Sequence, residues 1–139
     1  FASVVAGIGP RATPTIDEGV VYALSSNGIL AALDGATGDL LWQHDLPAEY
    51  GVSPAQESAT VLYGRANSPL VVGSLVIVPA GGLPGGHMVG LVAFDKESGE
   101  RIWEGGNRQV SYSSPSVASV AGVEQVLVLN EASVSAKPS

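Results

Sequence analysis

The chain has 139 residues, with 6 Lys plus Arg against 13 Asp plus Glu, and a formal net charge of −7. An acidic chain without a basic run repels phosphate backbones, so we expect no nucleic-acid partner. The sequence has no Cys, which excludes disulfides and thiolate metal sites. Its apolar runs are too short to predict a transmembrane segment.

Turn-forming residues are frequent, and helical periodicity is missing. The chain has 18 Gly and 9 Pro, and hydrophobic residues make up 45% of it, enough to build a core. The Val-rich runs are short, and no long stretch repeats apolar residues every 3.6 positions. This combination predicts an all-β fold of short strands joined by tight turns.

The stretch ALDGATGDLLW (32–42) predicts a tight hairpin. One strand ends at Asp34 and the next begins at Asp39. We expect the Asp34 carboxylate to accept hydrogen bonds from backbone amides of the turn and from the Thr37 hydroxyl. Gly38 can adopt the left-handed conformation that closes such a hairpin.

Trp42 ends this stretch and is predicted to be a docking residue. A large, rigid aromatic at the end of a strand can bury on the order of 200 Å² against a neighbouring sheet. Its best partner is a small residue such as Ala32 or a flat peptide face. We therefore interpret the stretch as a turn followed by a side chain that holds one sheet against the next.

The same pattern returns 61 residues later as AFDKESGERIW (93–103). Four positions are identical in the two copies, and another changes only from Thr to Ser. The matching pairs are Ala32 and Ala93, Asp34 and Asp95, Thr37 and Ser98, Gly38 and Gly99, and Trp42 and Trp103. A catalytic residue has no reason to recur in every unit, whereas a docking residue has, so we interpret all ten residues as structural.

Each copy follows a strand that opens after a Pro, and a third, partial copy comes later in the chain. The three openings are Pro14, Pro69 and Pro115. Once two insertions are set aside, the units repeat about every 40 residues. A period of this length with four short strands per unit is the signature of a β-propeller blade.

The spacing A-x-D-x-x-[TS]-G-x-x-x-W resembles the tryptophan-docking motif of the PQQ-like propeller repeat, and the resemblance covers residues 10–130. That family includes quinoprotein alcohol and glucose dehydrogenases, which hold pyrroloquinoline quinone (PQQ) and calcium. It also includes non-catalytic relatives such as the outer-membrane-assembly propeller lipoprotein. The resemblance implies export to the periplasm or the cell surface.

The active dehydrogenases of this family commonly carry an adjacent Cys pair against the cofactor. They also have a Trp floor and Asp, Glu or Asn ligands to calcium. This chain has no Cys, and none of the other site residues is matched here by motif. The resemblance therefore implies the scaffold more directly than it implies catalysis.

We interpret residues 1–139 as a partial propeller of about two and a half blades. The predicted parts are blade one (10–46), an inter-blade insertion (47–64), blade two (65–105) and the start of blade three (110–139). Ala136 falls where a third motif begins, although Pro138 stands where Asp is expected. So few blades cannot close a ring, so we expect the fragment alone to associate. No signal peptide is visible in this segment, which begins with Phe1 and is expected to be processed or partial.

The residues just before each strand-opening Pro are predicted to line the mouth of the central channel, where ligands usually bind. These candidates for ligand or cofactor binding are Arg11, Arg65, Asn67, Tyr112, Ser113 and Ser114. If the guanidinium groups of Arg11 and Arg65 converge on the central axis of the propeller, they can bind a carboxylate together. That carboxylate can belong to the quinone or to an acidic loop of the protein itself, and structural Arg residues are the more common case.

Two insertions interrupt the repeat. Residues 47–64 are too long for a simple connection and are predicted to cover one face of the ring or to bind a partner. The stretch GGLPGGHMVG (81–90) is predicted to be a mobile loop. Its glycines do not have the pattern of a phosphate-binding loop.

No catalytic or metal-binding constellation is visible in the sequence. His44 and His87 have no metal-ligand neighbour two to four residues further on, and we expect His44 to be solvated. The elbow of the serine hydrolases does not occur. The acidic residues are spread out and are interpreted as solubility charge on turns: Asp17, Glu18, Glu49, Glu57, Glu97, Glu104 and Glu124.

Taken together, these patterns favour a non-catalytic propeller that is exported and serves as a protein-binding or scaffolding module. We expect it to need no metal and no cofactor, and its partner to be a protein or the remaining blades. The alternative is a fragment of a PQQ- and calcium-dependent quinoprotein dehydrogenase that oxidises an alcohol or a sugar. A sensor or extracellular domain of a larger chain is a third possibility.

Overall fold

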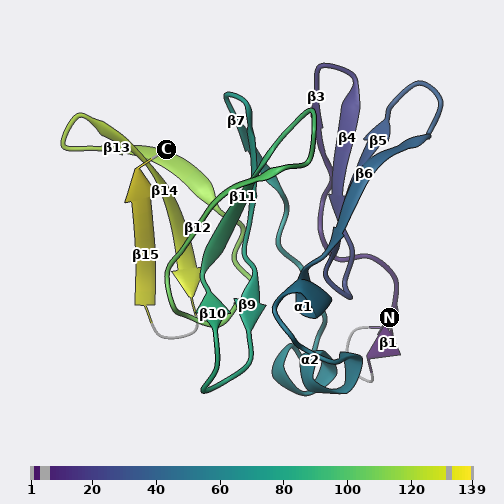
Figure 1. The fold of residues 1–139 in the computed structure, drawn as a ribbon, viewed down its shortest axis with the longest axis vertical. Helices are drawn as coiled ribbons and strands as arrows, with labels where there is room; N and C mark the ends of the chain where they lie inside the picture. Colours follow the sequence, from purple (N-terminus) through teal and green to yellow (C-terminus); the bar gives the residue numbers. More distant parts are fainter. Residues whose placement is uncertain (1, 4–6, 131–132, 139) are drawn as a thin grey trace.

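The computed structural model describes residues 2–3, 7–130 and 133–138, and it describes side chains for residues 9–130. Three antiparallel sheets stand side by side in a row, in the order of the sequence (Figure 1). A short hairpin of β1 (Ala2–Ser3) and β2 (Gly7–Ile8) precedes them. The all-β propeller architecture predicted from the repeat is therefore confirmed for this part of a ring.

The first sheet has four strands that follow one another in space as they do in the sequence. They are β3 (Thr15–Asp17), β4 (Val20–Leu24), β5 (Ile29–Asp34) and β6 (Leu40–Asp45). In β5 the fully buried Leu30 and Ala32 alternate with the half-buried Ala31 and Leu33. Since neighbouring side chains of a strand point to opposite faces, one face of this sheet is packed and the other is more open.

The second sheet repeats this topology with β7 (Leu70–Val72), β8 (Leu75–Val78), β11 (Leu91–Asp95) and β12 (Arg101–Gly105). Consecutive residues of β8, namely Val76, Ile77 and Val78, are each 0% exposed. Both faces of this sheet are therefore covered, by the first sheet on one side and the third on the other. A strand buried on both faces is apolar throughout instead of alternating.

The stretch 81–90 is a second, short hairpin and not the loop that the glycines predicted. Strand β9 (Gly81–Gly82) pairs with β10 (Met88–Val89). A Cβ atom on Gly82 would collide with the carbonyl oxygen of His87. The first Gly pair therefore allows two backbones to approach closely, which is a packing role that composition alone does not distinguish from flexibility.

The third sheet has three strands, β13 (Ser116–Val120), β14 (Val123–Asn130) and β15 (Ser133–Pro138). In β14 the buried Val126 and Val128 pack against Ile77 and Leu91 of the second sheet. The predicted third motif at Ala136 falls in β15, whose side chains lie outside the described residues.

The insertion 47–64 contains two short helices at one end of the row, below the sheets in Figure 1. Helix α1 (Leu46–Glu49) is capped by Asp45, whose Oδ1 accepts a hydrogen bond from the Ala48 amide at 3.0 Å. Helix α2 (Pro54–Thr60) begins with a reciprocal capping box between Ser53 and Gln56. Within the described part of the chain, no helix has the length and apolar character needed to cross a membrane.

Each end of the row presents apolar side chains. Ile16 is 71% exposed, and it faces away from the second sheet because its neighbour Thr15 donates a hydrogen bond to the Pro69 carbonyl there. At the other end, Val123 and Leu129 of the third sheet are 48% and 56% exposed. In a closed ring, further blades would cover such surfaces.

We expect residues 1–139 expressed alone to self-associate, because both end sheets leave apolar faces uncovered. Size-exclusion chromatography with light scattering measures this directly. Ile16→Ser should shift the population toward monomer. Ile102→Ser serves as the control, because Ile102 is also exposed, at 51%, but lies in β12 of the second sheet and not on an end sheet. A monodisperse, cooperatively melting wild-type monomer would contradict the expectation.

Candidate functional site: the channel mouth and the blade junctions

Trp42 of the first sheet lies against the motif turn of the second sheet. Its indole Nε1 donates a hydrogen bond to the Lys96 carbonyl at 3.1 Å. A Cβ atom placed on Gly99 would lie 2.7 Å from Trp42 Cγ, so the indole rests on bare backbone. Within its own sheet, Trp42 is the register partner of Ala32, which is 0% exposed. Both predicted partners, a small residue and a flat peptide face, thus lie against the Trp42 indole.

Other aromatic residues complete this junction. Tyr22 Oη donates a hydrogen bond to the same Lys96 carbonyl at 3.1 Å. The Trp42 ring centroid lies 5.9 Å from that of Tyr22 and 6.3 Å from that of Phe94. Such tilted aromatic contacts stabilise a junction beyond the area that they bury. Trp103, in the equivalent position of the second sheet, packs beside Val126 and Val128 of the third sheet.

The two motif turns share their backbone hydrogen bonds, but the Thr37 hydroxyl, which we expected to donate to Asp34, donates to Asp39 Oδ2 at 2.9 Å. Asp34 Oδ1 accepts hydrogen bonds from the Ala36 and Thr37 amides, each at 2.8 Å. Asp95 Oδ1 likewise accepts bonds from the Ser98 amide and hydroxyl at 2.8 and 2.9 Å. The Thr37 amide, and then that of Ala36, hold the pKa of the Asp34 carboxyl below its usual value. Gly38 and Gly99 close the turns with φ of +79° and +73°.

We expect Gly99→Ala to lower the free energy of unfolding by more than about 2 kcal/mol. The left-handed backbone costs a side chain about 1 kcal/mol, and the new methyl group would also push against Trp42. Gly73→Ala is the matched control, because Gly73 also has a positive φ, +57°, but no atom lies within 4 Å of its Cβ position. Urea unfolding of the intact protein measures both variants. Equal losses would show that Trp42 does not need this bare backbone.

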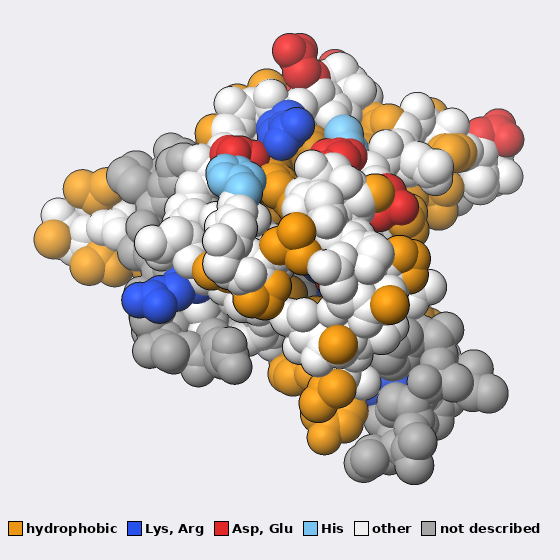
Figure 2. Space-filling model, turned by 60° about the horizontal axis from the view of Figure 1, so that its bottom comes forward, with side chains coloured by type: hydrophobic (Ala, Val, Ile, Leu, Met, Phe, Trp, Pro, Cys, Tyr) orange, Lys and Arg blue, Asp and Glu red, His pale blue; other side chains and the backbone are white. Residues whose placement is uncertain are grey.

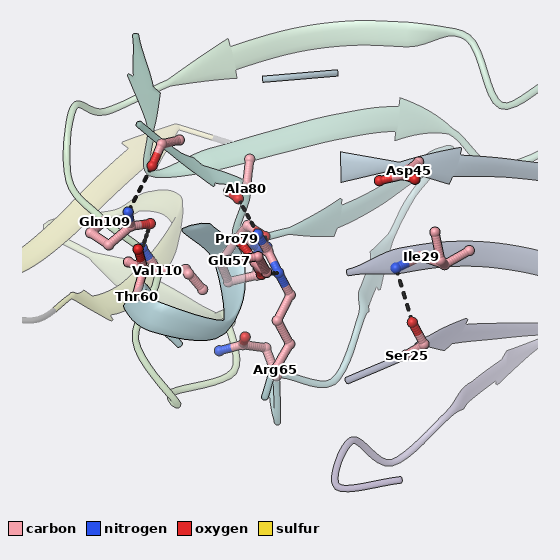
Figure 3. A network of polar contacts seen from close by, with 12 residues as sticks. Ser25, Ile29, Asp45, Glu57, Thr60, Arg65, Pro79, Ala80, Gln109 and Val110 are labelled. Carbon is pink, nitrogen blue, oxygen red and sulfur yellow. Dashed lines mark hydrogen bonds and ion pairs between the residues drawn. The ribbon is translucent and has the colours of Figure 1, made fainter. Parts of the chain in front are cut away.

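The Arg65 side chain, which was predicted to lie at the channel mouth, is buried inside the protein. It is 1% exposed, and its Nε lies 2.7 Å from Glu57 Oε1 of α2. Its other two guanidinium nitrogens donate to the Pro79 and Ala80 carbonyls at 3.0 and 2.8 Å. Figure 3 shows the side chain reaching between α2 and the second sheet. The sequence left open whether Arg65 binds a carboxylate of the quinone or one from an acidic loop of the protein. In the structure, the carboxylate that Arg65 binds is that of Glu57, in the protein's own insertion.

The remaining mouth residues join the second sheet to the start of the third. Asn67 is 0% exposed, and its Nδ2 donates to the Ser111 and Ser113 carbonyls at 2.8 and 2.6 Å. The Oδ1 of Asn67 is buried and accepts no hydrogen bond among the described residues. Tyr112 is 46% exposed, and its ring lies 5.7 Å from that of Tyr63. Arg11 lies half-buried ahead of β3.

The residue just before each opening Pro forms a hydrogen bond that joins successive sheets. The Thr13 amide donates to Ser68 Oγ at 3.0 Å, and the Ser68 amide donates to Ser114 Oγ at 2.8 Å. Sequence reasoning placed Ser114 at the mouth but missed this role. The repeated [ST]-P dipeptide was the available signal, since a residue type that recurs in every unit points to a scaffold role.

Charged side chains also join the first two sheets. Lys96 Nζ lies 2.8 Å from Asp17 Oδ2 and 2.7 Å from Glu18 Oε2. The hydrogen bonds that Lys96 Nζ donates to these two carboxylates, first Asp17 and then Glu18, raise the pKa of Lys96. Because Lys96 also supplies the carbonyl on which Trp42 rests, one residue of the motif turn holds the junction through both its backbone and its side chain.

Tyr50 anchors the insertion to the second sheet. It is 7% exposed, and its hydroxyl donates to Glu104 Oε2 at 2.9 Å. Arg101 Nη1 and His87 Nε2 also contact the Glu104 carboxylate, both at 3.1 Å. Figure 2 shows this face, where His, Arg and acidic side chains gather in one region. Burial first, and then the bond to Glu104, raise the pKa of Tyr50 to about 12.

Tyr50→Phe is expected to reduce the pH dependence of stability above pH 10. The folded-state pKa of about 12 lies above the unfolded value of 10.0. The tyrosine's contribution is therefore fully present below pH 10 and is lost as the pH rises toward 12. Wild type should lose on the order of 2 kcal/mol more than Y50F over this window, on the basis of about 1.4 kcal/mol per pKa unit. Urea unfolding at pH 8 to 12 measures the free energy of unfolding of both proteins. If it changed with pH equally in wild type and Y50F, the raised pKa of Tyr50 would be ruled out.

Two expectations about polar residues were wrong. His44 is not simply solvated, because its Nδ1 lies 2.7 Å from Glu49 Oε1, its Nε2 lies 2.8 Å from the Gly99 carbonyl, and its ring stacks on Phe94. The acidic residues are not only solubility charge on turns. Five of them bind a basic side chain or a His: Asp17, Glu18, Glu49, Glu57 and Glu104.

A cavity of about 340 Å³ lies between the two helices of the insertion and the first sheet. The turn between β4 and β5 forms one wall, and α1 and α2 form the others. Asp45 and Glu57 belong to its lining, and both are labelled in Figure 3. This cavity could not be predicted from the sequence, because its walls come together only when the two helices fold over the sheet.

Three sheets of this topology, docked through a repeated Trp motif and stapled at their inner edges, define part of a β-propeller. The family described as "Outer membrane protein assembly factor BamB" matches residues 6–136. The chain therefore belongs to this family of PQQ-like propeller repeats.

The individual relatives include alcohol dehydrogenases as well as BamB. A segment of 37 residues is 49% identical to the dehydrogenase subunit of the quinone alcohol dehydrogenase of Acetobacter aceti, over 27% of this chain and 5% of that protein. A quinohemoprotein alcohol dehydrogenase from Pseudomonas putida HK5 has a similar structure, with a TM-score of 0.64 and 22% identity over 94% of this chain and 19% of its own. BamB from Moraxella catarrhalis gives 0.52 and 18% over 92% and 34%.

The side chains described here do not by themselves fit a calcium-bound quinone. Among residues 9–130, no three His, Asp or Glu side chains come together to hold a cation. The guanidinium group of Arg65 already has an acceptor at each nitrogen. The chain spans less than a fifth of the dehydrogenases it resembles, so the activity of the whole protein is a matter for proposal.

Proposed function

We propose that the propeller containing this chain is exported and binds a polypeptide partner at the channel mouth without catalysing a reaction. The observation that carries the proposal is an apolar surface made by Leu62, Tyr63 and Tyr112, which we name the mouth patch. These side chains are 63%, 42% and 46% exposed. Exposed aromatic and aliphatic side chains that gather in one place are typical of protein-binding surfaces.

The mouth patch is held in place on both sides. Tyr112 Oη accepts a hydrogen bond from the Tyr63 amide at 3.4 Å, and the two rings lie 5.7 Å apart. Behind the patch, Val61 is 3% exposed and the Arg65–Glu57 pair ties the connection to α2. A patch that is already ordered loses little conformational entropy on binding, which favours recognition.

Membership of a family described by outer membrane protein assembly supports a binding role and an exported location. The use of the repeated motif residues also supports it, because Trp42 and Gly99 are in contact with each other and so hold the scaffold together. The partner would bring its own apolar side chains, since the patch itself offers ring faces and few charges.

The second candidate is a segment of a PQQ- and calcium-dependent alcohol dehydrogenase. The observation that favours it is the 49% identity over 37 residues with the Acetobacter aceti subunit. In that case the quinone would supply the redox chemistry, and the residues of this chain would contribute scaffold. The two candidates share the same blades and differ in what the rest of the ring provides.

The binding proposal predicts that peptides selected against the intact protein lose affinity when the mouth patch is changed. We expect Tyr112→Ser to weaken such peptides at least tenfold, because buried aromatic anchors dominate interface energetics. Tyr112→Phe is the matched control, since it keeps the ring and should bind within about threefold of wild type. Isothermal titration calorimetry measures both. Equal affinity of wild type and Tyr112→Ser would place the binding surface elsewhere.

The same intact protein distinguishes the two candidates when it is incubated with PQQ and calcium. Under the binding proposal we expect no dye-linked oxidation of ethanol or glucose above the rate of the cofactor alone. An active quinoprotein dehydrogenase, treated in parallel, controls for reconstitution. Calcium-dependent oxidation by this protein would overturn the non-catalytic proposal and establish the dehydrogenase.

A further inference from the structure

We infer that the cavity beneath α1 and α2 is a binding site for a small organic ammonium ion with a short hydrocarbon chain. This site is separate from the mouth patch, and the inference does not depend on the proposed function. The cavity has a volume of about 340 Å³, which is within the lower range of small-molecule sites in proteins. It lies between the first sheet and the insertion 47–64, which the basic repeat does not need.

The walls of the cavity are largely hydrocarbon. Ile29 contributes from β5, Pro47 from α1, and Val52 and Val61 from the segments on either side of α2. Val52 and Val61 are 6% and 3% exposed, so this part of the wall is fixed by packing. Such a surface favours an apolar portion in the ligand, because each buried methylene group contributes about 0.8 kcal/mol.

The charged groups in the lining are all carboxylates. Asp45 and Glu57 line the cavity, and no Lys, Arg or His is found among the described residues that do so. Arg65 reaches Glu57 at 2.7 Å but points its other nitrogens at the Pro79 and Ala80 carbonyls. Arg65 therefore balances the negative charge of Glu57, although Arg65 itself does not line the cavity. The Asp45 carboxylate has only the Ala48 amide as a described partner.

This distribution selects the chemistry of the ligand. An anion would meet the Asp45 carboxylate and find no cation in the lining, so neither a carboxylic acid nor the quinone with its three carboxylates fits here. An ammonium group can donate hydrogen bonds to Asp45 and to the side chains of Ser26 and Ser58, which also line the cavity. Charge-assisted bonds of this kind are about twice as strong as neutral ones. The hydrocarbon chain would then lie against Ile29 and Val61.

The test uses three four-carbon probes with the intact protein: n-butylammonium chloride, n-butanol and sodium butyrate. Isothermal titration calorimetry at low salt should show saturable binding of butylammonium, at least tenfold weaker binding of butanol, and no binding of butyrate. Equal binding of butanol and butylammonium would overturn the inference, because the cavity would then select for hydrocarbon alone. Failure of all three probes to bind would also overturn it.

Asp45→Asn removes the charge while keeping the structure, because Asn is as good a helix cap as Asp. We expect this variant to bind butylammonium at least tenfold more weakly and butanol as before. Glu100→Gln is the matched control, since it removes one exposed carboxylate that does not line the cavity, and it should leave both affinities unchanged. An unchanged affinity of Asp45→Asn for butylammonium would contradict the assignment of the ammonium site.

Filling the cavity tests its location. Ser58 is an exposed residue of α2 that lines the cavity, so Ser58→Phe places a ring in the space proposed for the ligand. We expect the binding of butylammonium to be lost in this variant, while thermal unfolding stays within about 2 °C of wild type because the site lies at the surface. Retained binding would place the ammonium ion elsewhere on the protein.

Discussion

The contact between Trp42 and the backbone of the next motif turn is the interaction on which this part of the propeller depends. An indole can lie flat on a turn only where no side chain intervenes, so Gly99 is required there by sterics as well as by its φ of +73°. The turn must also be rigid, and the hydrogen bonds from the Glu97 and Ser98 amides to Asp95 Oδ1 make it so. The small Ala32 opposite Trp42 leaves room for the ring within its own sheet. Four motif positions thus serve a single contact, which explains why they recur together.

A second set of hydrogen bonds joins the sheets at their inner edges. Together with the Trp42 contact, it leaves the connections between the sheets free to vary in length. The Thr13–Ser68 and Ser68–Ser114 bonds join successive inner strands near the axis, while Trp42 joins the sheets farther out. With both edges fixed, the connection after β6 can lengthen without disturbing the ring. Residues 47–64 use this freedom, and they are fastened at Tyr50–Glu104 and at Arg65–Glu57. The cavity and the mouth patch both arise from this addition.

Repetition made the fold and the Trp junction predictable, because a pattern seen twice separates scaffold from chance. What occurs once could not be predicted in the same way. Helix α2 is signalled only by its capping box at Ser53 and Gln56, a local cue that a search for repeats overlooks. The contacts of His44 depend on which residues the neighbouring sheet presents, Phe94 and Gly99, and these are 50 and 55 residues away in the sequence. Long-range pairs such as Tyr50–Glu104 carry no periodic signal at all.

The mouth residues illustrate how a polar side chain near a channel can be committed to structure. Both hydrogens of the Asn67 amide group are directed to carbonyls of the incoming third blade, and each guanidinium nitrogen of Arg65 has an acceptor. Except for the buried Asn67 Oδ1, these polar atoms already have partners and have little to offer a ligand, since a new contact must first break an old one. The surfaces that can still gain from binding are those with exposed rings or with a carboxylate lacking a cation. The insertion takes part in both, because it supplies Leu62 and Tyr63 of the mouth patch and its helices enclose Asp45 at the end of β6.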